Sequence, residues 1–198
     1  MIGILQGESV SIKTTYLNFG TLFALYDVDG YNIGYMDIEQ GKFDRSKAES
    51  EDAYRKIGEV YCPYLKEKVA FNAKGLEHVK LKERNKARSK IDQYMRLRLL
   101  AIAPKIVTSS HTLQEFYETK KLETQKINSR WEDRVRTVRY YGFVAIIKSA
   151  RIKIIVKEIE GGNKFFWSII PFWKNHQKNS GNNSINKKIL HAGNMEED

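Results

Sequence analysis

The spacing of apolar positions changes along the chain and predicts a β-rich start followed by helix. Residues 9–39 form short β-rich runs, and the Asp29-Gly30 step between two of them is a strong hairpin signal. We expect a small β-meander there. Polar residues then lead into a predicted short helix over residues 51–60, which Pro63 ends.

The middle of the chain has a mixed pattern with one long helical stretch. Residues 68–71 read as a short strand that runs into a turn at residues 72–75, His78 lies in the next segment, and we expect a strand with His78 before the long helix. From residue 85 to residue 106 the apolar positions have helical spacing, and Pro104 should kink or end this helix. Residues 111–137 are highly charged and predict a helix followed by an irregular region.

The last third returns to strand periodicity. Residues 137–148, 151–159 and 164–172 are rich in β-branched and aromatic side chains, and short connections separate them. This pattern predicts an antiparallel meander of three strands. In the second strand, Ile152, Ile154 and Val156 alternate with Lys153, Ile155 and Lys157.

The order of these elements predicts the α+β fold class. Helices packed on one face of an antiparallel β-sheet would bury the pattern and leave the other sheet face open for function. We expect three parts: a β-rich N-terminal appendage over residues 1–45, a basic α+β domain over residues 46–173, and a polar, flexible tail over residues 174–198.

The charge is distributed unevenly along the chain. Residues 1–60 carry 6 basic and 10 acidic side chains, a net charge of −4, whereas the whole chain has a net charge of +10, which leaves +14 for residues 61–198. A basic surface attracts phosphate and releases counterions on binding, so this distribution favours nucleic acid as the partner. A solvated basic face without a specific partner is the alternative.

Composition narrows the class of protein further. The chain has 198 residues, 41% hydrophobic, enough for one well-packed domain. A single cysteine, Cys62, cannot form an internal disulfide, and no segment has the length of a membrane span or the pattern of a signal peptide. We therefore expect a cytoplasmic protein without a membrane partner. Its oligomeric state stays open.

Metal and cofactor motifs are missing from the sequence. If Gly30 were the sixth position of a calcium loop, Leu25 and Met36 would occupy the first and twelfth positions, where oxygen ligands are needed. There is also no phosphate-binding glycine loop and no zinc-binding histidine pair on a helix. We expect no metal and no cofactor.

One order of elements is similar to a known family. The run His78-Val-Lys80 precedes a long helix ending at Ala103-Pro104-Lys105-Ile106, and a strand meander then ends in Phe166-Trp167-Ser168-Ile-Ile-Pro171. This order resembles the phage-borne nucleases of the barnase–EndoU–colicin–RelE-like (BECR) superfamily over about residues 61–173. The resemblance implies a metal-independent ribonuclease of phage or toxin type with helices on an antiparallel sheet. By position, it implies that His78 is the acid/base group, Ser168 the strand hydroxyl, and Lys80 and Arg84 the basic residues.

Such a ribonuclease would cleave RNA by attack of the ribose 2′-hydroxyl. The reaction needs a base for that hydroxyl, an acid for the leaving oxygen and cations for the phosphoryl charge. Histidine suits proton transfer near neutral pH. The second acid/base group stays open among Glu77, Tyr140, Tyr141 and Glu158, and a surface histidine on a basic edge is the alternative interpretation of His78.

Two other functions remain open. A non-catalytic RNA- or DNA-binding module would use the basic helix and exposed aromatic side chains. A partner-binding protein would use the acidic N-terminal segment, which could also shield the basic surface, and an inhibitor or immunity protein is a further partner to consider. For either nucleic-acid function, the residues expected to contact nucleic acid are Lys82, Arg88, Lys90, Arg96, Arg98, Arg151, Lys153, Lys157 and Trp167.

Overall fold

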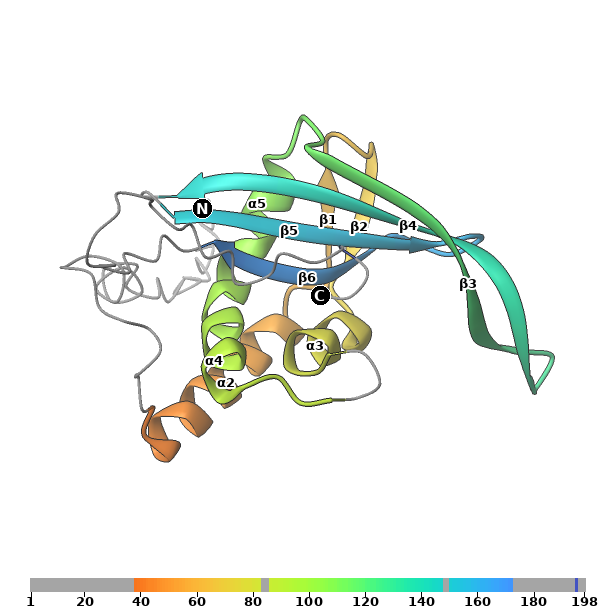
Figure 1. Cartoon of the computed structure of the whole chain (residues 1–198). Helices are drawn as coiled ribbons and strands as arrows, with labels where there is room; N and C mark the ends of the chain where they lie inside the picture. The colour runs from red at the N-terminus through yellow and green to blue at the C-terminus, as the bar shows by residue number, and fades with distance from the viewer. Residues whose placement is uncertain (1–37, 83–85, 148–149, 173–194, 196–198) are drawn as a thin grey trace, which may run out of the picture.

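The computed structural model describes residues 38–82, 86–147, 150–172 and 195. In this part of the chain, helices pack against a six-stranded, mostly antiparallel sheet (Figure 1), so the α+β fold class is confirmed. The N-terminal appendage lies outside the described residues up to residue 37. Arg84 also lies outside them, as does the 174–198 tail except for Met195.

The helices make up most of the layer that packs against the sheet. Asn72 and Ser89 are the N-caps of two of them, and each side chain accepts a hydrogen bond from the backbone N–H three residues later. These caps explain why the helices begin where they do. The helices are α2 (Gln40–Arg55), α3 (Ala73–Lys80), α4 (Lys90–Leu99), the 3₁₀ turn η3 (Leu100–Ile102) and α5 (Ala103–Thr108).

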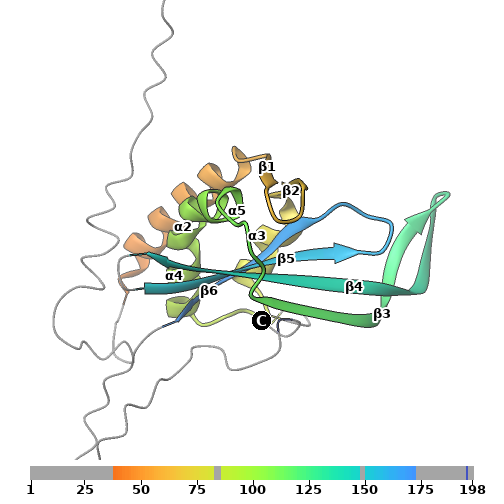
Figure 2. The ribbon, with the colours of Figure 1, turned by 90° about the horizontal axis from the view of Figure 1, so that it is seen from above.

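The six strands form a single sheet in the order β1-β2-β6-β5-β4-β3. Every neighbouring pair is antiparallel except β2 and β6, which are parallel and joined through the single pair Ala70 and Phe165. Figure 2 shows the helices gathered over one end of the sheet, with β3 and β4 extending beyond them. The strands are β1 (Glu59–Cys62), β2 (Glu67–Ala70), β3 (Glu115–Ile127), β4 (Arg130–Ile147), β5 (Ala150–Ile159) and β6 (Phe165–Phe172).

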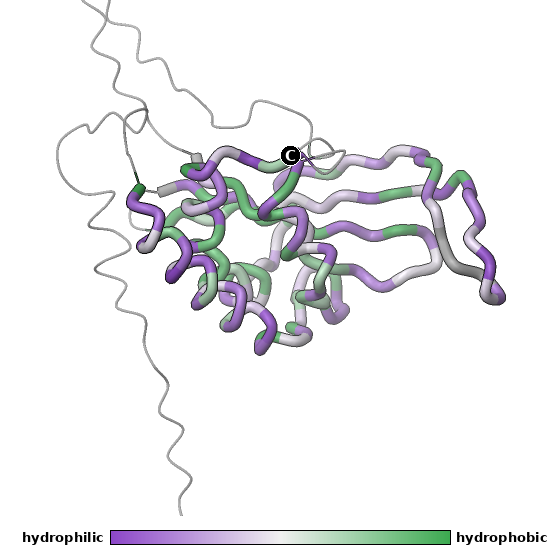
Figure 3. Tube along the Cα trace, turned by 90° about the horizontal axis from the view of Figure 1, so that it is seen from below, coloured by the Kyte–Doolittle hydropathy of each residue, from purple (hydrophilic) through white to green (hydrophobic). Residues whose placement is uncertain are grey.

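The alternation predicted in β5 is confirmed. Ile152, Ile154 and Val156 belong to the main core between helices and sheet, whereas Ile155 belongs to a smaller cluster with Tyr140 and other residues of the opposite face. In Figure 3, hydrophilic and apolar stretches alternate along the strands. The two sides of the sheet therefore have different chemistry, as a period of two residues requires.

The helix predicted within residues 111–137 is wrong. This segment contains β3 and the start of β4, which form a long hairpin that turns at Asn128 and Ser129 with φ of 47° and 69°. Positive φ at two successive residues is typical of a tight hairpin turn. The charged residues of the segment mask its β-strand character, because the hairpin extends beyond the helices (Figure 2) and its side chains need not be apolar.

The other helix boundaries differ from the prediction in three places. The helix predicted over residues 51–60 instead begins at Gln40, and β1 already occupies residues 59–62, so the boundary expected at residue 45 falls inside α2. His78 lies on α3 and not in a strand. The long predicted helix is divided by η3, and the chain stays helical past Pro104, because proline is tolerated in the first turn of α5.

Gly75 allows α3 to approach β6 closely. A Cβ atom at this position would lie 2.2 Å from the carbonyl oxygen of Phe166 and 2.7 Å from the Tyr54 hydroxyl. The Tyr54 hydroxyl also donates to the carbonyl oxygen of Asn72, which anchors the start of α3. Only glycine fits this contact, and the contact sets the height of α3 above the sheet.

Two glycine substitutions test this contact. Gly75→Ala should destabilise the fold by about 1–3 kcal/mol, because overpacking outweighs the better helix propensity of alanine. Gly41→Ala is the matched control, since Gly41 lies on α2 with open space around its Cα, and it should stabilise the fold by about 0.5–1 kcal/mol. Urea unfolding of both variants measures the difference, and equal effects would contradict the proposed contact.

Candidate functional site

His78 and Trp167 stack on each other where α3 meets β6. Their ring centroids lie 3.7 Å apart with an interplanar angle of 27°, and His78 is buried. The pairing of β5 with β6 shifts here: Val156 pairs with Phe166 and Ile155 pairs with Ser168. Trp167 is therefore the extra residue of a β-bulge, a feature that redirects a side chain relative to the regular sheet.

Lys157 extends this contact toward the opposite face of the sheet. Its Nζ lies 4.4 Å from the centroid of the Trp167 ring and 5.7 Å from that of Tyr140, both within range of a cation–π interaction. The same Nζ donates to Glu123 Oε1 of β3 at 3.3 Å. We call His78, Trp167, Lys157 and Tyr140 the stacked site.

The environment of Lys157 disfavours its protonated form. Burial lowers the pKa of Lys157, and the negative charge of Glu123 only partly opposes this effect. A lysine with a lowered pKa can exchange a proton closer to neutral pH than an exposed lysine can. The stacked site thus places a lysine whose pKa is lowered by burial on the same tryptophan ring as an imidazole.

A buried arginine cluster joins α4 to β6 and to α3. We define it as Arg88, Asp92, Arg96 and Ser168. Arg96 donates from Nε to Asp92 Oδ1 at 2.7 Å, and from Nη1 to Ser168 Oγ at 2.9 Å and to the carbonyl oxygen of Ile169 at 3.1 Å. Arg88 donates from Nη1 to Asp92 Oδ2 at 3.4 Å and from Nε to the carbonyl oxygen of His78 at 3.2 Å. The cluster therefore links Ser168 to the backbone of His78, two of the four residues implied by the family resemblance.

The four residues predicted to be catalytic have different locations. His78 and Ser168 lie in adjoining parts of the same buried region, connected by the arginine cluster. Lys80 turns toward α2, where its Nζ donates to Glu51 Oε1 at 3.1 Å. Arg84 lies outside the described residues. The arginine cluster thus reaches the backbone carbonyl of His78 and the hydroxyl of Ser168, whereas Lys80 has a different partner.

The predicted nucleic-acid contacts also separate into groups. Lys157 and Trp167 belong to the stacked site. Arg88 and Arg96 have side chains only 0% and 2% exposed, so the expectation that they lie on a phosphate-binding surface is wrong. Their spacing of four residues from Asp92 was a sequence signal for ion pairs with this carboxylate, although Arg88 lies just before the start of α4.

Three of the remaining predicted contacts already have partners within the fold. Lys153 donates to Glu115 Oε2 at 2.7 Å, Arg98 donates to the Tyr94 hydroxyl, and Lys90 donates to the carbonyl oxygen of Ile38. Lys82 and Arg151 are exposed.

Among the four groups considered for the second acid/base role, only Tyr140 lies in the stacked site. The Tyr141 hydroxyl donates to Glu158 Oε2 at 2.6 Å, and burial together with this bond raises the pKa of Tyr141. Glu77 is exposed on α3. Lys157 was predicted only to contact nucleic acid, because strand alternation assigns a residue to a face without showing which rings enclose it.

The sheet face expected to be open is partly covered. Met195 is buried in a cluster with Val138, Tyr140, Ile155 and Ile170. A Cβ atom at position 142 would lie 3.1 Å from the Met195 sulfur, so Gly142 provides the space for this contact. One residue of the C-terminal segment thus packs beside the stacked site.

Comparison of the chain with family models, with curated protein sequences and with solved structures gave no match. Within the described residues, no group of three or more histidine, cysteine, aspartate or glutamate side chains is arranged to hold a metal ion. None of the helices described is both long and apolar enough to cross a membrane. The site must therefore be interpreted from its own geometry.

Replacing Asp92 tests the arginine cluster. Asp92→Ala leaves two buried guanidinium groups without their shared carboxylate and should destabilise the fold by about 3–5 kcal/mol. The matched control is Asp52→Ala on α2, which removes an exposed pair with Lys56 and should cost less than about 1 kcal/mol. Chemical denaturation of both variants gives the comparison. Equal losses of unfolding free energy in the two variants would show that the buried cluster stabilises the fold no more than an exposed ion pair does.

The lowered pKa of Lys157 predicts a pH dependence of stability. Because the unfolded chain holds this proton more tightly, the protonated lysine destabilises the fold at neutral pH, and this penalty declines as pH rises from the lowered pKa toward the ordinary value of 10.5. The free energy of unfolding of the wild type, relative to Lys157→Met, should therefore increase over that range. Urea unfolding at several pH values measures it, with Lys120→Met as the control. A relative stability that falls with pH would contradict the prediction.

Proposed function

We propose that this protein is a metal-independent endoribonuclease that cleaves RNA through the ribose 2′-hydroxyl at the stacked site. The observation that carries the proposal is the contact of both His78 and Lys157 with the ring of Trp167. Transesterification needs one group that removes a proton and one that donates a proton. An imidazole and an ammonium group in the same site can fill these two roles. The resemblance to the BECR superfamily points to the same activity.

Each residue of the stacked site has a role in this proposal. His78 removes the proton from the 2′-hydroxyl, while Lys157 protonates the leaving 5′-oxygen or stabilises the phosphoryl charge. The Tyr140 ring and the Trp167 ring hold the ammonium group. The indole N–H of Trp167 is buried and has no acceptor among the described residues, so in this proposal Trp167 acts through its ring.

Ser168 and Arg96 are positioning residues in this proposal. Ser168 accepts a hydrogen bond from Arg96, and Arg88 of the same cluster binds the carbonyl oxygen of His78. The cluster thereby fixes β6 and the end of α3, which carry Trp167 and His78. The hydroxyl of Ser168 acts on the arrangement of the site and not on the reacting phosphate.

A second candidate function is non-catalytic binding of nucleic acid by the β3–β4 hairpin. Trp131 near the hairpin turn is 71% exposed, and Arg130 beside it is also exposed. An exposed tryptophan next to a cation can stack on an unpaired base. A protruding two-stranded ribbon is also a known shape for contact with a nucleic-acid groove.

Cleavage of a labelled RNA oligonucleotide tests the main proposal. His78→Ala and Lys157→Met should each lower the rate by about 10²–10⁴-fold, and an RNA with 2′-deoxy sugars should not be cut. Addition of EDTA should leave the rate unchanged. Trp131→Ala is the control on the hairpin and should retain cleavage at the stacked site.

Three results would count against this assignment. Wild-type rates in His78→Ala would exclude His78 as the acid/base group. Cleavage of the deoxy oligonucleotide would exclude the 2′-hydroxyl mechanism. Salt-dependent RNA binding without any product, lost in Trp131→Ala, would favour the hairpin-binding function instead.

A further inference from the structure

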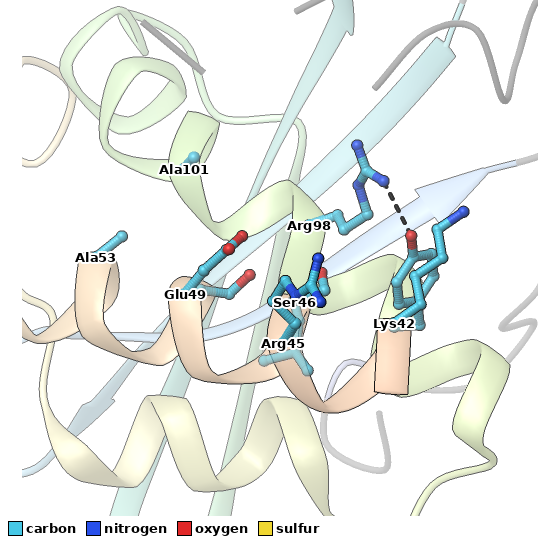
Figure 4. Close-up of a pocket in the computed structure, with 10 residues that line it drawn as sticks. Lys42, Arg45, Ser46, Glu49, Ala53, Arg98 and Ala101 are labelled. Atoms are coloured by element: carbon cyan, nitrogen blue, oxygen red, sulfur yellow. Dashed lines mark hydrogen bonds between the residues drawn. The ribbon is translucent and has the colours of Figure 1, made fainter. Parts of the chain in front are cut away.

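A groove between α2 and α4 forms a cavity of about 230 Å³ away from the stacked site. Figure 4 shows side chains of both helices around it, and none of them belongs to the stacked site or the arginine cluster. The polar groups that matter here are Lys42, Arg45, Ser46, Glu49 and Ser50 from α2 and Arg98 from α4.

Helical spacing brings these polar groups to one side of α2. Lys42, Arg45, Ser46 and Glu49 follow the i, i+3, i+4, i+7 pattern that places side chains on one face of a helix. The buried apolar residues of α2, Phe43 and Tyr54, lie outside this pattern. Where two helices pack directly, the facing stripe is normally apolar. The polar stripe of α2 borders a space that its side chains leave unfilled.

The cations of this groove lack carboxylate partners in the described part of the chain. No described carboxylate oxygen lies within 4.0 Å of the side-chain nitrogens of Lys42, Arg45 or Arg98. On the same helix, by contrast, Arg55 and Lys56 pair with Glu51 and Asp52 at 3.0 Å and 2.6 Å. Glu49 is the single acidic residue of the lining, so three cations face one anion.

Arg98 is oriented by a neutral partner. Its Nη1 donates to the Tyr94 hydroxyl at 2.9 Å, a bond drawn in Figure 4, and its guanidinium carbon lies 5.6 Å from the centroid of the Tyr94 ring. A guanidinium has five N–H donors, and one bond to a hydroxyl leaves its charge uncompensated. Tyr94 therefore holds a positive charge in place at the groove without neutralising it.

We propose that the groove between α2 and α4 binds a phosphate group. Arg45, Arg98 and Lys42 supply charge and N–H donors for its oxygens, and the Ser46 and Ser50 hydroxyls supply further donors. The volume is below the roughly 300–1,000 Å³ of pockets for larger ligands, which suits a phosphate with little more than its ester attached. The phosphate can come from a free nucleotide or from the 5′ end of a nucleic acid strand. This proposal does not depend on cleavage at the stacked site.

Titration of the full chain with inorganic phosphate tests the groove. Calorimetry at constant ionic strength, with chloride replaced by phosphate, should show saturable binding. Arg45→Gln and Arg98→Gln should each raise the dissociation constant for phosphate about tenfold or more, because each removes a charge-assisted contact. Lys47→Gln, on the same helix but outside the lining, is the matched control and should leave the affinity unchanged.

Two further probes identify the source of the phosphate. A nucleoside 5′-monophosphate represents the free nucleotide, and a DNA oligonucleotide with a 5′-phosphate or a 5′-hydroxyl represents the strand end and resists 2′-hydroxyl cleavage. A preference for either phosphorylated probe that disappears in Arg45→Gln supports the site and names its source. The proposal is overturned if phosphate shows no saturable binding, or if Arg45→Gln and Lys47→Gln bind it equally. His78→Ala should bind phosphate normally, which separates this result from failure of the ribonuclease proposal.

Discussion

The sharing of one carboxylate by two buried guanidinium groups is the interaction on which the rest of the described fold depends. Asp92 accepts hydrogen bonds from Arg88 and Arg96, whose guanidinium groups are almost fully buried. Removing two charges from water is costly, and the cost is offset only when every donor finds an acceptor. Further donors of the two guanidinium groups, Arg88 Nε and Arg96 Nη1, reach a carbonyl on α3 and two oxygens on β6. The same residues that solve this charge problem therefore set the relative positions of α3, α4 and β6.

The sequence predicted those parts of the fold in which the periodicity of apolar residues matches the alternation of core-facing and outward-facing positions. The β4–β5–β6 meander was predicted because Ile152 and Ile154 face the core and lysines face the other side. The β3–β4 hairpin was not, since its strands carry charges on both sides: residues 115–124 alternate between half-buried and exposed positions, but their hydropathy does not follow this period. The start of α2 was also missed, because this helix is polar along the face that borders the groove.

Residues of the candidate site could be predicted from the sequence only where the residue type itself indicates a chemical role. His78 was predicted as an acid/base residue, and the family resemblance linked it to Ser168. Lys157 could not be assigned such a role, because its altered pKa arises from burial and from rings on β4 and β6 that only the folded chain brings together. Arg88 and Arg96 were predicted to be surface cations for the converse reason. The residue type alone does not distinguish a buried arginine from an exposed one.

Most strand pairs of the sheet are consecutive in the chain, whereas other contacts of the fold join residues far apart in the sequence. This difference has a consequence for the order of folding. Strands β3 to β6 pair with neighbours that follow directly in the chain, so these pairings close short loops and form at small entropic cost. The bond between Arg96 and Ser168 instead joins residues 72 positions apart. A folding chain can thus complete its β-meander while α3 and α4 are still undocked. The histidine and the lysine would come together only in the last step, so an incompletely folded chain would lack the assembled site.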